Sequence, residues 1–299
     1  MIISHFLENL KKWEVEYIEN YDISRRSFIG IGAVIRLAVF PKTVPELIKC
    51  VSFLSENGLT FKTVGALSNI LFKDPYFDGV IVETEKINRF FIDGNRVKLE
   101  CGVRISKIHR ELIRSSLSGF EEISGIPGTL GGMIYSNAGA FGATVSDHLD
   151  FAAVYDLKAR EYRELSTSSL DFSYRHSALS ERNLILLFAS FTLKKGSEQE
   201  ILARTAHYKT IRMQTQPYNE MSLGSVFKRE GEIPVSRLID EAGLKGFSVG
   251  CACVSKKHAG FIVNDGGASA NDVLELIEII KKTVYERYGV MPREEIEII

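Results

Sequence analysis

The spacing of apolar and polar positions along the chain predicts several amphipathic helices. Thr43-Val-Pro-Glu46 forms a capping box with proline in the first turn, and Gly58 follows the last apolar position of that pattern. A second capping box, Ser197-Glu-Gln-Glu200, opens another helix. Helices are therefore expected over Met1–Tyr17, Thr43–Gly58, Ile105–Leu117, Ser197–Met213, Leu238–Ala242 and Asn271–Tyr288.

Short apolar runs between these helices predict strands, several of them bounded by turn residues. Asp93-Gly94-Asn95 is typical of a hairpin turn. The order strand, helix, strand and glycine-led turn over 33–69 is typical of a nucleotide site. Strands are expected over Ala33–Phe40, Phe61–Val64, Val80–Glu83, Arg89–Ile92, Val97–Cys101, Phe151–Asp156, Glu161–Leu165, Leu184–Leu193 and Gly260–Asn264.

Composition narrows the class of protein. The chain has 299 residues, 45% hydrophobic and 25% charged, which suits a folded protein of two or three lobes. Its 37 basic and 38 acidic residues give a net charge of −1, so we expect neither nucleic-acid nor membrane partners. No apolar run is long enough to span a membrane and no signal peptide precedes the first helix, so we expect a cytoplasmic location. The near-neutral net charge and mixed surface permit a monomer, which is the state we expect.

The cysteines indicate no metal site. Four cysteines are too few and too scattered for a disulfide framework or a zinc site. Cys251 and Cys253 alternate as in a strand, so both thiols are expected on one buried face.

The glycine-rich stretch Ser124–Gly142 is the strongest candidate for ligand binding. It holds six of the 24 glycines in 19 residues and carries no charge. Glycine lets the main chain come close to a flat or phosphorylated ligand, whereas a linker would be polar. On glycine content alone, a tight turn inside a core remains an equal alternative.

Three distant segments carry polar groups that suit reductive chemistry. They are Tyr174–Ser177, Gly224–Phe227 and Arg293–Ile296. Taken singly, each is more typical of a surface ion pair, a turn or a solvated terminal carboxylate. Taken together with the glycine segments, and in their order along the chain, the three segments are no longer independent of one another.

These landmarks resemble the MurB family of UDP-N-acetylenolpyruvoylglucosamine reductases, from about Ser27 to Ile299. The spacing before Gly224 leaves no room for the tyrosine-loop insertion of one subgroup, so the chain resembles the shorter type II form. The matching segments are Ser124–Gly132, Asn137–Gly139, Asp171–Ser177, Thr215–Pro217, Gly224–Phe227, Leu238–Gly246 and Val254–Asn264.

The resemblance implies an α+β fold with FAD and NADPH as cofactors. A two-lobed FAD-binding domain of the PCMH (vanillyl-alcohol-oxidase-like) type would precede a smaller α+β substrate-binding domain. The expected boundaries are 1–20 for an N-terminal helix, 21–196 for the FAD domain (lobes 21–80 and 81–196) and 197–299 for the connecting helix and substrate domain. The substrate would be a nucleotide sugar, UDP-N-acetylglucosamine enolpyruvate, reduced to UDP-N-acetylmuramate for peptidoglycan.

Three residues would carry the reaction by this resemblance. Arg175 would hold the substrate carboxylate and stabilise the charge that develops there. Glu295 would complete that polarisation, and Ser225 would protonate the α-carbon. Tyr174, Arg175, Gly224 and Ser225 would bind the substrate.

The same resemblance assigns cofactor contacts to two segments. Leu67 stands where the family usually has a glycine, so we expect it to strain the turn or push the diphosphate outward. This departure leaves a second hypothesis, a descendant with impaired FAD binding that acts as a scaffold or regulator; a flavin oxidase of the wider fold family is a third. The expected cofactor residues are Gly65, Ala66, Leu67, Ser68, Asn69, Ile70, Ile126, Pro127, Gly128, Gly131, Gly132, Asn137 and Gly139.

Overall fold

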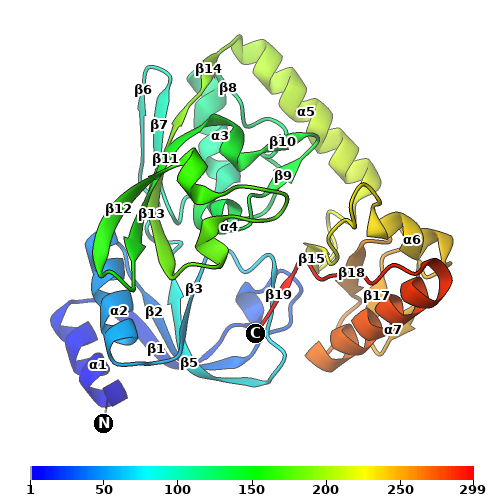
Figure 1. The fold of residues 1–299 in the computed structure, drawn as a ribbon, viewed down its shortest axis with the longest axis horizontal. Coiled ribbons are helices and arrows are strands. Elements are labelled where there is room, and N and C mark those ends of the chain that lie inside the picture. The colour runs from blue at the N-terminus through cyan, green and yellow to red at the C-terminus, as the bar shows by residue number, and fades with distance from the viewer. Residues whose placement is uncertain (1) are drawn as a thin grey trace. The chain divides into compact units, whose positions relative to one another are not determined.

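The computed structural model describes residues 2–299, which form two compact units (Figure 1). The first unit contains the chain up to Tyr21 together with Ile35–Ala66 and Asp78–Lys209. The second contains Asp22–Val34, Leu67–Phe77 and Thr210–Ile299. Each unit has its own cluster of buried apolar side chains, so each is held together by its own core.

One part of the first unit is a four-stranded sheet with two helices. The strand order is β1-β2-β5-β3, and β3 runs parallel to β5. Strands β2 and β3, which precede and follow α2 in the chain, are not neighbours in the sheet, because β5 lies between them. Helices α1 and α2 pack through the rings of Phe6 and Phe53, whose centroids are 5.0 Å apart. The elements are α1 Ile2–Lys12, β1 Glu16–Asp22, β2 Val34–Phe40, α2 Val44–Glu56, β3 Phe61–Val64 and β5 Tyr76–Glu83.

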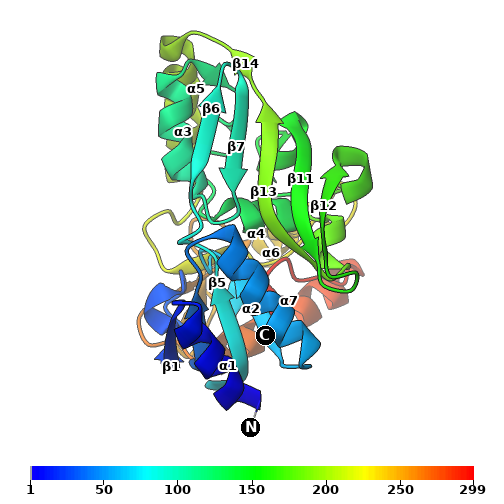
Figure 2. The same cartoon turned by 90° about the vertical axis from the view of Figure 1, so that its left-hand side faces the viewer.

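The other part of the first unit is an antiparallel five-stranded sheet, ordered β12-β11-β13-β7-β6 (Figure 2). The Ser52 hydroxyl of α2 donates to the Tyr155 hydroxyl of β11 at 2.8 Å and so links the two parts. The elements are β6 Phe90–Asp93, β7 Arg96–Glu100, α3 Ile105–Arg114, β8 Leu117–Ser118, α4 Leu130–Tyr135, β9 Gly139–Ala140, β10 Ala143–Thr144, β11 Leu149–Asp156, β12 Glu161–Ser166, β13 Leu184–Thr192, β14 Lys194–Lys195 and α5 Glu198–Thr215.

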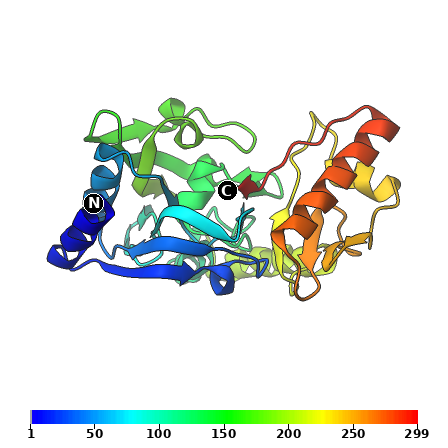
Figure 3. The ribbon, with the colours of Figure 1, turned by 90° about the horizontal axis from the view of Figure 1, so that it is seen from below.

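The second unit is built on a small antiparallel sheet, ordered β15-β18-β17-β16, with α7 packed on it. The chain leaves α7 as an extended C-terminal segment (Figure 3). That segment ends in β19, which pairs in parallel with β4. The elements are β4 Ile70–Leu71, β15 Ser222–Ser225, α6 Val235–Glu241, β16 Ser248–Val249, β17 Ala252–Val254, β18 Phe261–Asn264, α7 Ala270–Tyr288 and β19 Glu297–Ile298.

Most elements predicted from the pattern are present, and the expected α+β class is confirmed. The Thr43 hydroxyl accepts from the Glu46 N–H at 3.3 Å and caps α2 as predicted. The reciprocal half of the capping box differs, because the Glu46 carboxylate accepts from the N–H of Lys42 at 2.8 Å instead of from that of Thr43. The hairpin turn is also confirmed, because Asp93 and Arg96 pair across it.

Two sequence predictions are wrong. The first helix ends at Lys12, not Tyr17, because Glu14 takes a left-handed φ of 59° and the chain then enters β1. The two cysteines do not share a buried face: Cys253 lies buried in β17, whereas Cys251 precedes the strand and is exposed. The turn at Gly250, with φ of 53°, breaks the alternation on which the prediction depended.

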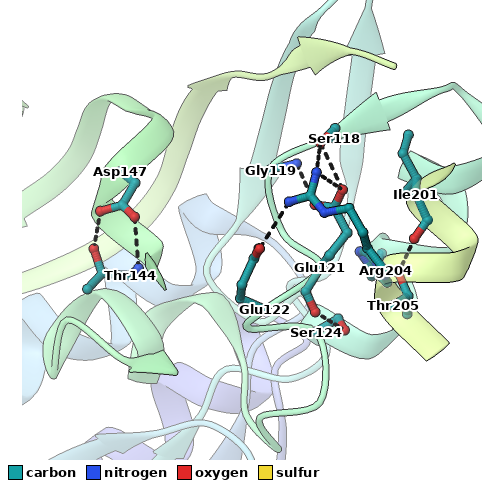
Figure 4. Close-up of polar contacts among 11 residues, drawn as sticks. Ser118, Gly119, Glu121, Glu122, Ser124, Thr144, Asp147, Ile201, Arg204 and Thr205 are labelled. Carbon is teal, nitrogen blue, oxygen red and sulfur yellow. Dashed lines mark hydrogen bonds and ion pairs between the residues drawn. The ribbon is translucent and has the colours of Figure 1, made fainter. Parts of the chain in front are cut away.

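A buried carboxylate anchors the first half of α5 to the loop after β8 (Figure 4). The fully buried Glu121 accepts from the Ser118 hydroxyl at 2.8 Å and from the Gly119 N–H at 2.7 Å, and Arg204 of α5 lies 3.4 Å away. Burial alone would raise the pKa of Glu121, but these hydrogen bonds and the Arg204 charge outweigh it, so the pKa is lowered. The anchor therefore stabilises the fold while this carboxylate is ionised, and is lost as the pH falls through its lowered pKa.

Within residues 2–299, no helix is long and apolar enough to cross a membrane. Nor does this part of the chain bring three or more His, Cys, Asp or Glu side chains together in an arrangement that suits a metal ion.

Candidate active site

Arg175 sits in a tight turn of the first unit. Ser173 and His176 exchange two backbone hydrogen bonds of 3.2 Å, which leaves Tyr174 and Arg175 at the tip. Arg175 takes a left-handed φ of 54°, an uncommon conformation for a residue with a side chain. Its guanidinium donates to the carbonyl of Gly139 at 3.2 Å and lies over the Tyr174 ring, 5.3 Å from the centroid.

Three polar contacts dock this turn on the glycine-rich segment. The Asn137 amide donates to the carbonyl of Ser173 at 3.0 Å, and the buried Ser177 hydroxyl donates to the carbonyl of Tyr135 at 2.8 Å. With the Arg175 contact to Gly139, they join segments that lie far apart in sequence. The first unit therefore brings together the predicted residues Tyr174, Arg175, Asn137 and Gly139.

The two glycine-led cofactor segments also meet within the first unit. A β-carbon added to Gly65 would lie 2.0 Å from the Thr129 hydroxyl, so only glycine fits beside that side chain. Thr129 directly precedes the short helix α4, Leu130–Tyr135, which was not predicted. Ile126 and Gly128 are half-buried, whereas Pro127 and Gly132 are exposed.

Two buried oxygens in this region test whether the residues fit a bound cofactor. Among residues 2–299, neither the Thr129 hydroxyl nor the side-chain carbonyl of Asn137 has a hydrogen-bond partner. Buried polar atoms are normally paired, so these two positions suit polar atoms of a ligand. Together with the close approach at Gly65, this fits a cofactor with phosphate and amide groups, such as FAD.

Thr129 is a candidate cofactor contact that the sequence prediction missed. The signal was its position, since threonine between Gly128 and Gly131 at the start of a helix is typical of a cap residue. No Thr129 side-chain cap hydrogen bond forms in α4, which leaves the hydroxyl available to a ligand.

Leu67 adopts the conformation that a glycine would favour. Its φ is 56° and its side chain is 2% exposed. Branched and bulky side chains make left-handed backbone costly, by about 1–2 kcal/mol. The strained turn expected from the sequence is therefore present, and burial of the leucine side chain offsets its cost.

Replacing Leu67 should reverse the usual ranking of alanine and glycine. We expect both Leu67→Ala and Leu67→Gly to lose about 2–5 kcal/mol of stability through the lost buried side chain. Because only glycine relieves the left-handed strain, Leu67→Gly should be more stable than Leu67→Ala by about 1 kcal/mol in urea unfolding. Leu54, fully buried in the last turn of α2, is the matched control, where alanine should be the more stable. The same ranking at both positions would contradict the strain.

Ser225 ends strand β15 of the second unit. Gly224, with φ of 76°, interrupts the pairing register with β18 just before it. Ser225 pairs with Phe261, and its hydroxyl donates to the carbonyl of Phe227 at 3.3 Å. The side chain is half-buried. The irregularity at Gly224 turns the Ser225 hydroxyl away from the direction that it would take in a regular strand.

Glu295 lies beside Ser225 along the backbone. Its N–H donates to the carbonyl of Val226 at 2.7 Å, and its carbonyl accepts from the Asn69 amide at 3.0 Å. The N–H of Glu297 donates to the carbonyl of Asn69 at 2.9 Å. Within the second unit, Glu295 is therefore hydrogen-bonded both to the predicted cofactor residue Asn69 and to Val226, the residue that follows Ser225.

The predicted residues fall into two groups, one in each unit. Arg175 and Tyr174 with the glycine-rich segment belong to the first unit, and Gly224, Ser225 and Glu295 to the second. The Gly65–Ile70 segment is divided between them after Ala66. The joint action of all three catalytic candidates stays a prediction.

Comparison with known proteins identifies the family of this chain. Residues 35–160 match the family model of an FAD binding domain, and residues 216–299 match that of the UDP-N-acetylenolpyruvoylglucosamine reductase C-terminal domain. The chain is 40% identical to the UDP-N-acetylenolpyruvoylglucosamine reductase of Caldicellulosiruptor saccharolyticus, covering 98% of this chain and 95% of that protein. The corresponding reductase of Lactobacillus acidophilus is 37% identical, with 98% of both chains covered.

A solved structure has the same fold. The chain superposes on UDP-N-acetylenolpyruvylglucosamine reductase (MurB) from Thermus caldophilus with a TM-score of 0.80 and 29% identity, covering 95% of this chain and 98% of the other.

Proposed function

The chain belongs to the MurB family of UDP-N-acetylenolpyruvoylglucosamine reductases, and from this premise we propose which of its residues carry the reaction. It is an FAD-containing, NADPH-dependent oxidoreductase that reduces the enolpyruvyl group of UDP-N-acetylglucosamine enolpyruvate to give UDP-N-acetylmuramate, in peptidoglycan precursor synthesis. Its fold is of the α+β class, with an FAD-binding domain of the PCMH type. The observation that supports the proposal is that two buried oxygens, of Thr129 and Asn137, have no hydrogen-bond partner within residues 2–299 and that Asn137 also binds the turn that carries Arg175.

Transfer of a hydride from NADPH to the β-carbon of the enolpyruvyl double bond is the chemistry that bound FAD supplies. Thr129 and Asn137 would offer hydrogen bonds to it, and the main chain at Gly65, Gly128 and Gly131 would allow its close approach. Ser68 and Asn69, in the turn before β4, would donate to its phosphates.

Arg175 addresses the main chemical difficulty of the substrate. An enol ether is electron-rich, so it resists a hydride unless its carboxylate withdraws electrons. The planar guanidinium of Arg175 would bind that carboxylate through two donors and stabilise the negative charge that develops on it. The docked turn holds Arg175 in place, because Asn137 fixes the carbonyl of Ser173. Glu295 would complete the polarisation from the second unit.

Ser225 would protonate the α-carbon after hydride addition. A serine hydroxyl has a high intrinsic pKa, so it acts as an acid only toward a strongly basic carbanion. Its present acceptor, the carbonyl of Phe227, lies at 3.3 Å, a long hydrogen bond that the proton can leave at low cost.

A non-catalytic scaffold is not favoured. Identity of 40% over nearly the whole length to a named reductase, and a matched FAD-binding domain, support an enzyme. Burial of the Leu67 side chain offsets the cost of its strained backbone, and the turn forms. The monomeric state, the cytoplasmic location and the absence of nucleic-acid and membrane partners remain part of the proposal.

A spectroscopic cycle tests this function. The purified protein, loaded with FAD, should bleach near 450 nm on addition of NADPH under anaerobic conditions. Addition of UDP-N-acetylglucosamine enolpyruvate should then restore the oxidised spectrum and yield UDP-N-acetylmuramate. A protein that takes up no FAD, or whose reduced flavin is not reoxidised by this substrate, would overturn the proposal.

A further inference from the structure

Two adjacent glutamates stand where the proposed function needs only one. Glu294 and Glu295 lie in the extended segment after α7, and Glu294 bridges to Phe227 in an antiparallel manner. Successive side chains of an extended segment point to opposite sides. The two carboxylates are chemically identical, so the side on which each lies must be fixed by their surroundings.

An ion pair with Lys281 places the Glu294 carboxylate on the side of the segment that faces α7. Its ammonium lies 3.0 Å from the Glu294 carboxylate and 3.0 Å from that of Glu278, one turn earlier on α7. Both members of the Lys281–Glu294 pair are sheltered, with side chains 22% and 28% exposed. Hydrogen bonds to Glu278 and Glu294 raise the pKa of Lys281, so its charge is retained.

Other contacts of this segment include backbone hydrogen bonds and an ion pair of the neighbouring Arg293 with Glu230, 2.8 Å long. The hydrogen bonds from Glu295 to Val226 and from Asn69 to Glu295 use main-chain atoms, so they do not distinguish one glutamate from the next. Ile296, 6% exposed in the second core, opposes a shift by its burial. The sheltered ion pair is the contact that identifies Glu294 by its carboxylate.

We propose that Lys281 is a positioning residue for the reductase, which holds Glu294 on the α7 side and so keeps Glu295 on the opposite side for the substrate. This assignment rests on the proposed function. Without Lys281, the Glu294 carboxylate loses its neutralising partner in a sheltered position, and the segment gains an alternative in which Glu294 turns outward. The fraction of molecules with Glu295 correctly placed then falls.

Lys281→Met tests this, because methionine keeps the unbranched apolar stem and removes the charge. The matched control is Lys282→Met, the next residue on α7, whose pair with Glu286 is long at 3.9 Å and exposed. We expect NADPH to reduce the flavin of both variants at the wild-type rate. Reoxidation by the enolpyruvyl substrate should be about 10-fold slower in Lys281→Met and unchanged in Lys282→Met.

A double variant and a conservative one separate positioning from general loss of structure. Lys281→Met with Glu294→Gln removes both charges and should recover most of the reoxidation rate, and Lys281→Arg should retain it. A Lys281→Met variant that reoxidises as fast as Lys282→Met would overturn the proposal. So would a double variant that stays as slow as the single one.

Hydrogen exchange tests the positioning role of Lys281 without relying on turnover. The amides of Glu295 and Glu297 are protected by their bonds to Val226 and Asn69, so a peptide covering residues 293–299 reports on this segment. Its exchange should be about 10-fold faster in Lys281→Met than in the wild type or Lys282→Met. If the wild type itself failed to reoxidise, the reductase function would be wrong, while unchanged exchange in Lys281→Met would overturn the positioning role.

Discussion

Ser225→Ala should reduce its flavin with NADPH at the wild-type rate and yet turn over the enolpyruvyl substrate about 10³-fold more slowly. The reason is that the hydroxyl is needed only when the α-carbon takes its proton, and general acids of this kind contribute about 10²–10⁴-fold. The substitution should leave the fold intact, because the hydrogen bond that this hydroxyl donates to the carbonyl of Phe227 is long, at 3.3 Å. Anaerobic stopped-flow absorbance separates the two half-reactions.

Ser222→Ala is the matched control for this experiment. Ser222 lies at the other end of β15 and pairs with Val263, so it shares the strand and the residue type but not the irregularity at Gly224. Both half-reactions of the control should match the wild type. Equal losses in both half-reactions of Ser225→Ala would mean that the residue supports the flavin site or the fold rather than the proton transfer.

Arg175→Lys should lower the rate of the second half-reaction about 10²-fold while NADPH still reduces the flavin. Lysine keeps the positive charge but lacks the planar pair of donors that binds a carboxylate at two points, and a missing donor at a developing charge costs about 10²–10³-fold. The left-handed φ of 54° is no harder for lysine than for arginine, so the turn should persist. Single-turnover reoxidation measures the effect.

Arg182→Lys provides the comparison for Arg175→Lys. Arg182 is exposed and its guanidinium has a long contact of 3.5 Å with the carbonyl of Ser169, so the same change should alter neither half-reaction. A second half-reaction of Arg175→Lys within 2-fold of the wild type would exclude two-point binding of the carboxylate by this side chain.

Local chemistry explains which elements were predictable. The N-cap at Thr43 and the hairpin at Gly94 depend on residues close in sequence, and both are present. Strand β1 was missed because the charges around it also suit a helix, and the left-handed turn at Glu14 that separates them has no glycine to announce it. Helix α4 was missed because its six residues include two glycines, which rarely favour a helix.

The candidate site shows the same limit. Motif positions such as Arg175 and Ser225 follow from resemblance, but the contacts that hold them are long-range. Nothing near Asn137 indicates that its amide binds Ser173, and nothing near Lys281 indicates that it faces Glu294. Strain at Leu67 was predictable because the conformation of that turn is local. The environment of the Thr129 hydroxyl was not predictable, because it depends on the long-range packing of Thr129 against Gly65.

The discontinuous second unit has a consequence for the nascent chain. Ile29 accepts a hydrogen bond from Asn264, and Leu71 pairs with Ile298, so two early segments wait for partners that are translated late. At about 5–20 residues per second, the ribosome needs roughly ten seconds or longer to pass from these early segments to their late partners. During this time the apolar side chains of Ile29 and Leu71 cannot be buried, because most of the second core has not yet been translated. Chaperone capture during translation should therefore centre on these two early segments and end soon after the last strand emerges.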